Sequence, residues 1–308
     1  MKHKSVLLEE TIETLNLQED SIVVDCTLGY GGHSSEILKR IKRGYLFAFD
    51  QDQEAIDASS VRLSEIGNNF TIIKSNFVYL KEKLKREGVE QVDAILFDLG
   101  VSSPQLDEKE RGFSYHQDAK LDMRMDRDQP FSAYELVNTY SEGQLVDIFY
   151  RFGEEKFSRS IARAIVKKRA THPIETTLEL AEVIKNAVPE RVRREKHPAR
   201  KVFQAIRIEV NHELDILEKS IKDALTLLKP HGRLAVITFH SLEDRIVKNI
   251  FKEVTTVDDM VKGLPDIPIE YQKNYRLVNA KAIVPGKEEL SENNRARSSK
   301  LRVIERIR

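Results

Sequence analysis

The fold of this chain is decided by the stretch Ile22-Val23-Val24-Asp25-Cys26-Thr27-Leu28-Gly29-Tyr30-Gly31-Gly32-His33. Its apolar start predicts a buried strand, and its glycines predict a turn that leads into a helix. Glycine adopts positive φ easily and lets a ligand approach backbone N–H groups that a side chain would cover. A strand, a glycine-rich turn and a helix in this order are typical of a site for a nucleotide-like cofactor.

A second predicted strand, residues 44–50, supports this interpretation because it ends in Asp50. A carboxylate roughly twenty residues after the turn can accept hydrogen bonds from ribose hydroxyls. The dinucleotide fingerprint has a third glycine where this chain has Ser34, so a ligand with a pyrophosphate is not well supported. S-adenosyl-L-methionine has no pyrophosphate and does not require that glycine. An ordinary strand-to-helix turn remains the alternative for the glycines taken alone.

Strands and helices alternate in the first third of the chain, which predicts a parallel α/β sheet. Strands are expected at 21–25, 44–50, 70–74 and 92–99, with helices at 33–42 and 52–66 and a lysine-rich helix before the fourth strand. The rhythm resumes with an amphipathic segment at 203–229, a turn at Pro230-His231-Gly232 and strands at 233–239, 276–284 and 300–305. Residues 1–105 and 203–308 are therefore predicted to form one discontinuous domain, with residues 106–202 inserted in it.

The inserted residues are predicted to be all-helical, because they contain three capping boxes. These are Ser132-x-x-Glu135, Ser141-x-x-Gln144 and Thr176-x-x-Glu179. After Thr176 the apolar residues follow helical spacing, so one face of that helix is expected to pack on a neighbouring helix.

The composition limits the class of protein. The 308 residues include 50 Lys and Arg and 50 Asp and Glu, so only local clusters can indicate a nucleic-acid interface. Residues 1–15 mix charged with apolar residues, unlike a secretory signal, and no apolar run is long enough to span a membrane. The single cysteine, Cys26, excludes an internal disulfide, fits a cytoplasmic location and is expected to be buried filler. The eight histidines show no metal-ligand spacing, so no metal is expected.

Asp98 is the main catalytic candidate because it lies near the end of the fourth strand, where open α/β sheets bind ligands. A carboxylate there can orient an amine nucleophile and accept its proton. Capping of the following turn is the alternative, since aspartate is favoured in turns. His240, just after another strand, is a candidate general base. A structural or RNA-positioning role ahead of Ser241, a candidate helix cap, is its alternative.

Six motifs, in order along the chain, indicate a known family. They are Asp25-x-Thr-Leu-Gly-Tyr-Gly-Gly-His-Ser34, Asp98-Leu-Gly-Val-Ser-Ser-Pro-Gln-Leu-Asp107, Arg111-Gly-Phe-Ser114, Leu121-Asp-Met-Arg-Met-Asp126, Thr238-Phe-His-Ser-Leu-Glu-Asp-Arg245 and Asn294-Arg-Ala-Arg-Ser-Ser299. Over essentially its whole length the chain resembles the ribosomal RNA small-subunit methyltransferase H family, also called MraW. Two small departures are Gln51, where relatives often have a basic residue, and His231, which interrupts a Leu-Lys-Pro-Gly-Gly turn.

The resemblance implies methyl transfer from S-adenosyl-L-methionine to the exocyclic N4 of a cytidine in the decoding region of 16S rRNA, with the assembled small subunit favoured as substrate. It implies a class I, Rossmann-like methyltransferase fold with a seven-stranded, mostly parallel sheet and a helical insertion. The expected cofactor contacts are Asp25, Gly29, Gly31, Gly32, His33, Asp50, Phe77, Asp98 and Gln105. The expected catalytic residues are Asp98, Ser102, Ser103 and Pro104, with His240 as a further candidate.

Other residues are expected to contact the RNA. Phe113 or Tyr115 could stack on an extruded base, with packing in the core or in a lid as the alternative. The charged residues Asp122, Arg124 and Asp126 have a structural expectation instead, since they should fix a loop by pairing with one another. Two basic clusters are expected to dock RNA, with a solvated helix face as the alternative for either. One holds Arg191, Arg193, Arg194, Lys196, Arg200 and Lys201, the other holds Arg159, Arg163, Lys167, Lys168 and Arg169, and Arg295, Arg297, Lys300 and Arg302 could extend them.

Two other functions remain open at this point. One is an assembly factor that binds the cofactor and docks on the ribosome without catalysis. The other is a nicotinamide-dependent oxidoreductase, which the glycine turn and Asp50 allow and Ser34 weakens. The sequence leaves the oligomeric state open between a monomer and a homodimer, and it does not identify the residue that removes the amine proton.

Overall fold

The computed structural model describes residues 5–101, 108–195, 197–257, 260–261, 265–266, 268 and 271–308. The chain folds into two compact units. We call Met1–Gly100 with Leu214–Arg308 the sheet unit and Val101–Glu213 the inserted unit. Each is described by itself below.

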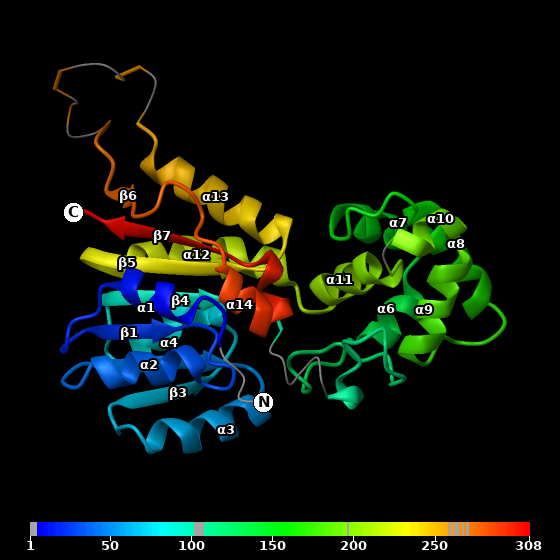
Figure 1. Ribbon diagram of the computed structural model, residues 1–308, viewed down its shortest axis with the longest axis horizontal. Coiled ribbons are helices and arrows are strands. Elements are labelled where there is room, and N and C mark those ends of the chain that lie inside the picture. Colours follow the sequence, from blue (N-terminus) through cyan, green and yellow to red (C-terminus); the bar gives the residue numbers. More distant parts are fainter. Residues whose placement is uncertain are drawn as a thin grey trace. The chain divides into compact units, whose positions relative to one another are not determined.

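The sheet unit is built on seven strands in the order β3-β2-β1-β4-β5-β7-β6 (Figure 1). Five of them pair in parallel: β1 (Ile22–Asp25), β2 (Tyr45–Asp50), β3 (Phe70–Lys74), β4 (Val92–Asp98) and β5 (Leu228–Thr238). The last two, β6 (Tyr275–Leu277) and β7 (Lys300–Arg306), are antiparallel to their neighbours. The predicted seven-stranded, mostly parallel sheet is thus confirmed.

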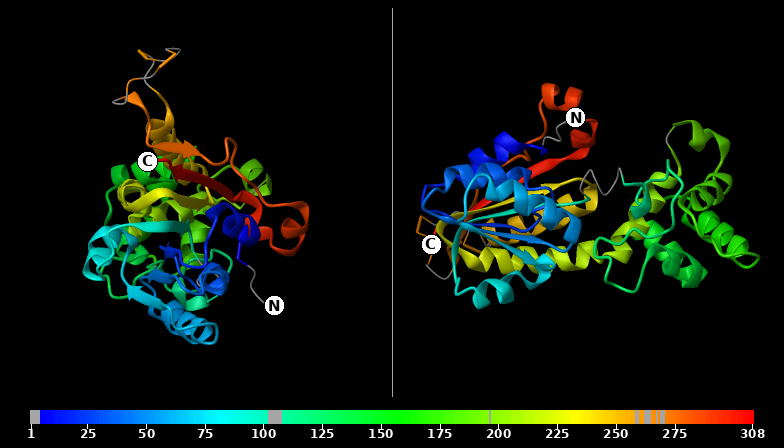
Figure 2. Two further views of the ribbon diagram at one scale, coloured as in Figure 1. Left: turned by 90° about the vertical axis from the view of Figure 1, so that its left-hand side faces the viewer. Right: turned by 90° about the horizontal axis from the view of Figure 1, so that it is seen from below.

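Helices cover both faces of this sheet (Figures 1 and 2). Alternate strand residues point to opposite faces, so Val23 and Leu46 pack with one set of helices while Val24 and Phe47 pack with the other. The first set is α1 (Leu8–Leu15), α2 (Gly32–Arg40) and α3 (Gln53–Ser64). The second set is α4 (Leu80–Arg86), α12 (Glu213–Leu227) and α13 (Ser241–Thr255). Shorter elements are η1 (Phe77–Tyr79), α14 (Lys287–Glu292) and η4 (Asn294–Ser298).

The inserted unit is a helical domain with its own apolar core. Its elements are η2 (Lys109–Arg111), α6 (Ala133–Thr139), α7 (Glu142–Arg151), α8 (Ser158–Arg169), α9 (Thr177–Asn186), α10 (Glu190–Glu195) and α11 (Ala199–Val210). All three predicted capping boxes are present, at Ser132, Ser141 and Thr176. In each box the side chains at the N-cap and N3 positions satisfy backbone N–H groups that the helix leaves unpaired.

The unit boundaries differ from the predicted ones. The amphipathic segment predicted at 203–229 belongs to two helices, α11 and α12, because the chain breaks at Asn211 and His212, where His212 has a φ of 51°. The apolar face of α11 packs in the core of the inserted unit, which moves the boundary from residue 202 to residue 213.

Three smaller elements also differ from prediction. Pro230-His231-Gly232 was predicted as a turn, but it lies within β5, where the pairing with β4 is irregular and His231 has a φ of 66°. The expected strand at 276–284 is reduced to the three residues of β6. The cap of α13 is His240 rather than Ser241.

Candidate functional site

Three aspartates end neighbouring parallel strands of the sheet unit. Asp25, Asp50 and Asp98 are the last residues of β1, β2 and β4, and β1 lies between the other two. The carboxyl ends of parallel strands meet at one edge, and the chain reverses its winding direction between β1 and β4. Such a switch point is where open α/β sheets bind ligands.

The glycine turn follows β1 at this edge and leads directly into α2, as predicted. Gly29 and Gly31 have φ values of 49° and 74°, which other residues adopt only with strain. A Cβ atom at Gly32 would lie 1.8 Å from Oγ of Ser5, so a side chain there would require Ser5 to move. The Ser59 hydroxyl on α3 donates to the carbonyl of Gly29 at 2.6 Å and so fixes the turn from the next helix.

Asp50 supports the turn directly. Its Oδ2 accepts the N–H of Gly29 at 2.7 Å, and its Oδ1 accepts the N–H of Asp52, the N-cap of α3, at 2.9 Å. Each carboxylate oxygen can accept a second hydrogen bond, so Asp50 can still bind a ribose hydroxyl. Burial raises the pKa of Asp50 to about 6, with the Asp52 carboxylate acting in the same direction and the N–H groups opposing it.

Asp25, a predicted cofactor contact, lies beneath the same turn and bonds to the protein itself. It is buried, its Oδ1 accepts the N–H of Thr27 at 3.1 Å, and its Oδ2 accepts the hydroxyl of Ser34 at 2.7 Å. Burial raises its pKa. The sequence treated Ser34 only as a departure from the dinucleotide fingerprint, whereas in the structure it is the partner of a buried carboxyl group. Next to it, Cys26 is buried, as predicted, and burial raises the pKa of its thiol well above the usual value.

Asp98 has two differently placed carboxylate oxygens. Its backbone N–H donates to Oγ1 of Thr27 at 2.6 Å, which fixes the end of β4 against the turn. Its Oδ2 lies 3.4 Å from Nδ1 of His33, the second residue of α2. Its Oδ1 is buried and has no hydrogen-bond partner among the described residues. A buried acceptor without a partner is costly in a folded protein, so this oxygen is the one that a ligand would satisfy.

The remaining predicted cofactor and catalytic residues lie near this edge or outside the described residues. Phe77 begins η1 just after β3, and its ring packs edge-on against Phe97, the residue before Asp98, with 5.3 Å between ring centroids. Ser102, Ser103, Pro104 and Gln105 lie outside the described residues.

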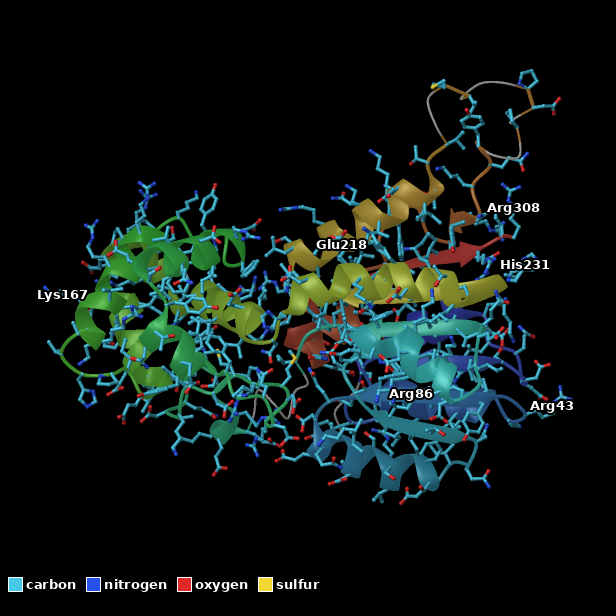
Figure 3. The ribbon with its side chains drawn as sticks, turned by 180° about the vertical axis from the view of Figure 1, so that it is seen from behind. Arg43, Arg86, Lys167, Glu218, His231 and Arg308 are labelled. Carbon is cyan, nitrogen blue, oxygen red and sulfur yellow. The ribbon has the colours of Figure 1, made fainter. Side chains whose placement is uncertain are left out.

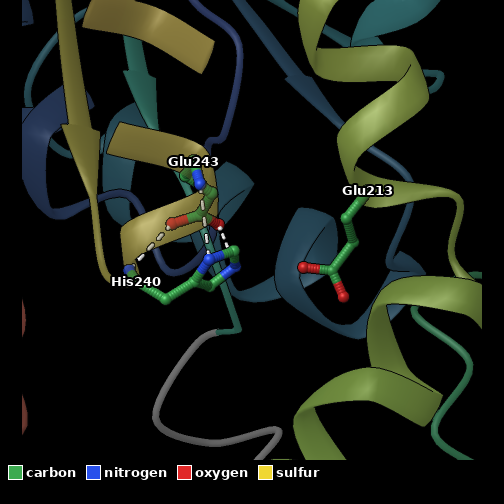
Figure 4. A group of neighbouring side chains, drawn as sticks. All are labelled: Glu213, His240 and Glu243. Carbon is green, nitrogen blue, oxygen red and sulfur yellow. Dashed lines mark hydrogen bonds and ion pairs between the residues drawn. The ribbon is translucent and has the colours of Figure 1, made fainter. Parts of the chain in front are cut away.

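His240 caps a helix in the structure (Figure 4). Its Nδ1 accepts the N–H of Glu243, and Glu243 returns the bond by accepting the N–H of His240 at 3.2 Å. The other ring nitrogen, Nε2, lies 3.1 Å from Oε1 of Glu243. Nδ1 therefore caps α13, while Nε2 is buried and forms no hydrogen bond with the described residues, so the structural role and the general-base role both stay open.

The two candidate stacking residues are packed inside the inserted unit. Phe113 is buried in its core, so the packing alternative applies to it. Tyr115 is half-buried and stacks on the ring of His197 at 4.6 Å between centroids, with Phe203 edge-on at 5.5 Å. The loop between them and α6 is fixed by the predicted pairing of Asp122 with Arg124, at 2.8 Å.

Many of the predicted RNA-binding cations are engaged by the protein itself. In the first cluster, Arg193 donates to the carbonyl of Val188, Arg194 pairs with Glu190, and Lys201 donates to the carbonyl of Glu154. Arg200 is exposed, and Lys196 lies outside the described residues. Arg191 is exposed on α10.

The second cluster leaves an exposed basic row on α8. Arg159, Arg163 and Lys167 are exposed and spaced four residues apart, so they follow one stripe of the helix, and Lys167 projects from the unit in Figure 3. Arg163 lies 3.8 Å from a carboxylate oxygen of Glu142, a long distance for an ion pair. Lys168 is exposed as well. Arg169 does not belong to the row, because it donates to the carbonyls of Val137 and Tyr140 at the end of α6.

The carboxy-terminal cations contribute less to such a surface than expected. Lys300 and Arg302 both pair with Asp244 of α13, at 2.8 Å and 2.7 Å. Arg297 is exposed on η4, and the side chain of Arg295 lies outside the described residues. No described helix is both long enough and apolar enough to cross a membrane.

Comparison with known proteins gives one consistent result. Residues 1–307 match the family model described as the MraW methylase family. Proteins named Ribosomal RNA small subunit methyltransferase H are 54% identical in Exiguobacterium sibiricum, over 100% of this chain and 99% of that protein, and in Lactiplantibacillus plantarum, over 100% and 98%. The protein of the same name in Streptococcus dysgalactiae subsp. equisimilis is 54% identical over 99% of this chain and 98% of its own length.

Proposed function

Because the chain belongs to the MraW methylase family, we propose that it methylates the exocyclic N4 of a cytidine in the decoding region of 16S rRNA. The fold is that of a class I methyltransferase, and the methyl donor is S-adenosyl-L-methionine. The relatives are named small-subunit rRNA methyltransferases, which supports ribosomal RNA of the small subunit as the substrate. Membership of a methylase family removes the nicotinamide-dependent oxidoreductase as an alternative.

The observation that carries the proposal is the buried, unpartnered Oδ1 of Asp98 at the switch point of the sheet. The N4 amino group of cytosine is conjugated with its ring and is weakly nucleophilic. It needs an acceptor that orients its lone pair and takes its proton as the N–C bond forms. In this proposal the methyl group leaves sulfur, bonds to N4, and one N4 proton passes to Oδ1 of Asp98.

The residues at the sheet edge fit the methyl donor. Asp50 would bind the ribose, the turn at Gly29 to Gly32 would lie against the donor, and Phe77 would form part of the wall. When bound, S-adenosyl-L-methionine supplies a methyl group made electrophilic by a positively charged sulfur.

The inserted unit would hold the RNA through its exposed basic row on α8. Four residues of helix advance about 6 Å, so Arg159, Arg163 and Lys167 present charges at regular intervals to a phosphate backbone. Such contacts give affinity that falls with salt and carries no sequence preference. Selection of one cytidine must therefore come from the shape of the assembled subunit and from the catalytic site.

The proposal predicts a specific product. Purified protein with labelled S-adenosyl-L-methionine is expected to modify small subunits that lack the methylation, and nuclease digestion followed by mass spectrometry should yield N4-methylcytidine from the decoding region. Naked 16S rRNA should react more slowly than assembled subunits. Transfer to another atom would contradict the proposed specificity. Tight binding to subunits without any transfer would instead support a non-catalytic assembly factor.

Binding of the methyl donor is expected to depend on pH through Asp50. Ribose hydroxyls donate to the ionised carboxylate, and the pKa of Asp50 is about 6 in the free protein. Affinity should therefore be constant above about pH 7.5 and fall about tenfold between pH 7.5 and pH 5 as the carboxylate gains a proton. Calorimetric titration with S-adenosyl-L-methionine across this range measures the effect.

The control for this prediction is Asp50→Asn. The amide cannot ionise, so binding should be weaker at pH 7.5, by about 10- to 100-fold, and the dependence on pH should become much flatter. A wild-type affinity that stays constant down to pH 5 would show that Asp50 does not bind the donor in its ionised form.

A further inference from the structure

His33 faces carboxyl groups from two neighbouring strands. The ring is buried, with 4% of the side chain exposed, and its Nδ1 lies 3.4 Å from Oδ2 of Asp98 on β4. Asp25 on β1 is buried nearby and adds to the negative potential at the ring, as does the carbonyl of Val6. Burial alone would lower the pKa of His33, but Asp98 and Asp25 outweigh it, so the pKa is raised. The proton on His33 is thus stabilised by the acidic groups around it.

The geometry fixes this pair from several sides. The backbone of Asp98 is held by the hydroxyl of Thr27, and the N–H of Thr27 is held in turn by Asp25. His33 lies in the first turn of α2, whose start is fixed by Asp25 through Ser34. These bonds hold the backbone near both residues, so the imidazole and the carboxylate project from fixed points at the start of α2 and the end of β4.

The two oxygens of Asp98 therefore have different surroundings. Oδ2 has a cationic or N–H partner in His33, whereas Oδ1 is buried without a partner among the described residues. A carboxylate that is held at one oxygen presents the other in a single direction. An enzyme gains rate from such fixed acceptors, because their orientation requires no rearrangement during the reaction.

We propose that His33 is a positioning residue for methyl transfer, which holds Oδ2 of Asp98 and so directs Oδ1 to the amino group that receives the methyl. This inference rests on the proposed function, in which Asp98 binds that amino group. It gives His33 a role toward Asp98 that differs from the cofactor contact suggested by sequence resemblance.

The test compares two substitutions of His33. His33→Leu removes the donor, and single-turnover methyl transfer to small subunits at saturating donor should fall about 10- to 100-fold. His33→Asn places an N–H group near the position of Nδ1, so it should recover the rate to within about fivefold of wild type. Calorimetry should give donor affinities within about threefold of wild type for both. His172→Leu, at an exposed histidine, serves as the control.

A double-mutant cycle separates positioning from a general structural effect. In an Asp98→Asn background, His33→Leu should slow transfer by less than about twofold, because the carboxylate that His33 holds is already gone. Three results would each overturn the proposal. They are additive effects of the two substitutions, transfer by His33→Asn that is as slow as by His33→Leu, and a loss that lies entirely in donor affinity.

A measurement on folded protein covers the case in which His33→Leu does not fold. Titration of the His33 ring by NMR should show a lower pKa in Asp98→Asn than in wild type, and an unchanged pKa would overturn the pairing. The proposed function is tested separately, by identifying the atom that the wild-type protein methylates. Methylation at an atom other than N4 would refute that specificity, while the coupling between positions 33 and 98 would still decide the role of His33.

Discussion

Asp98→Asn is expected to lower the rate of methyl transfer to small subunits about a thousandfold, and it should change the affinity for S-adenosyl-L-methionine much less, by about threefold. The amide keeps the shape of the side chain but cannot accept the proton that the proposed transfer to N4 releases. Its two ends also differ, so if its oxygen faces His33 its N–H group faces the substrate, and the reverse orientation puts the N–H group against His33. A positioned acid or base contributes about 10²- to 10⁴-fold to rate, which sets the expected size.

The measurement separates binding from chemistry. Single-turnover transfer at saturating donor gives the chemical step, and calorimetry gives the donor affinity of the same preparation. Asp57→Asn is the matched control, because Asp57 is an exposed aspartate of α3 in the same unit. Asp98→Ala should be at least as slow as Asp98→Asn. Transfer by either variant at near the wild-type rate would remove Asp98 from the mechanism.

The parts of the fold that could be predicted from sequence are those with a local cause. Strand 70–74 coincides with β3, and the other sheet strands before it lie within about one residue of prediction, because an apolar run ended by a turn is a local signal. The capping boxes at Ser132, Ser141 and Thr176 need only four residues each. Parallel pairing then brings Asp50 and Asp98 to one edge without further information.

The contacts that the sequence could not reveal are formed between distant side chains. Nothing near His33 indicates Asp98 as its neighbour, and nothing near Ser34 indicates that its hydroxyl binds Asp25. Basic clusters mislead for the same reason: Arg169 and Lys201 look like free cations in sequence, yet both donate to backbone carbonyls from other segments.

Helix ends without a standard signal also escaped prediction. His240 caps α13 although histidine is not a favoured N-cap residue, and Ser241 beside it is the more usual choice. The break between α11 and α12 contains neither glycine nor proline, so residues 203–229 were predicted as one amphipathic segment without a break. The sequence does not reveal the role of Asn211 at this break, where its side chain forms hydrogen bonds with a separate loop.

Asn211→Leu is therefore expected to destabilise the inserted unit by about 3 to 5 kcal/mol. The side chain is buried, and its Oδ1 accepts the N–H of Met125 while its Nδ2 donates to the carbonyls of Met123 and Arg207, each at 2.8 Å. Leucine fills the space but leaves the loop's N–H and carbonyl groups unpaired, at about 1 to 3 kcal/mol for each buried group. The loop is strained as well, since Met123 is buried with a φ of 59°, so losing its anchor should release it.

This effect should be confined to one unit, because the sheet unit has separate apolar cores and holds the predicted donor site. Hydrogen exchange should show lost protection in residues 108–210 first, and thermal unfolding should shift to lower temperature. Donor affinity at 25 °C should stay within about threefold of wild type, whereas transfer to small subunits should fall steeply, because in the proposed function the inserted unit docks the substrate. Asn186→Leu, at an exposed asparagine of α9, is the control. Equal loss of protection in both units would show that they unfold as one, and an unchanged transfer rate would place RNA docking elsewhere.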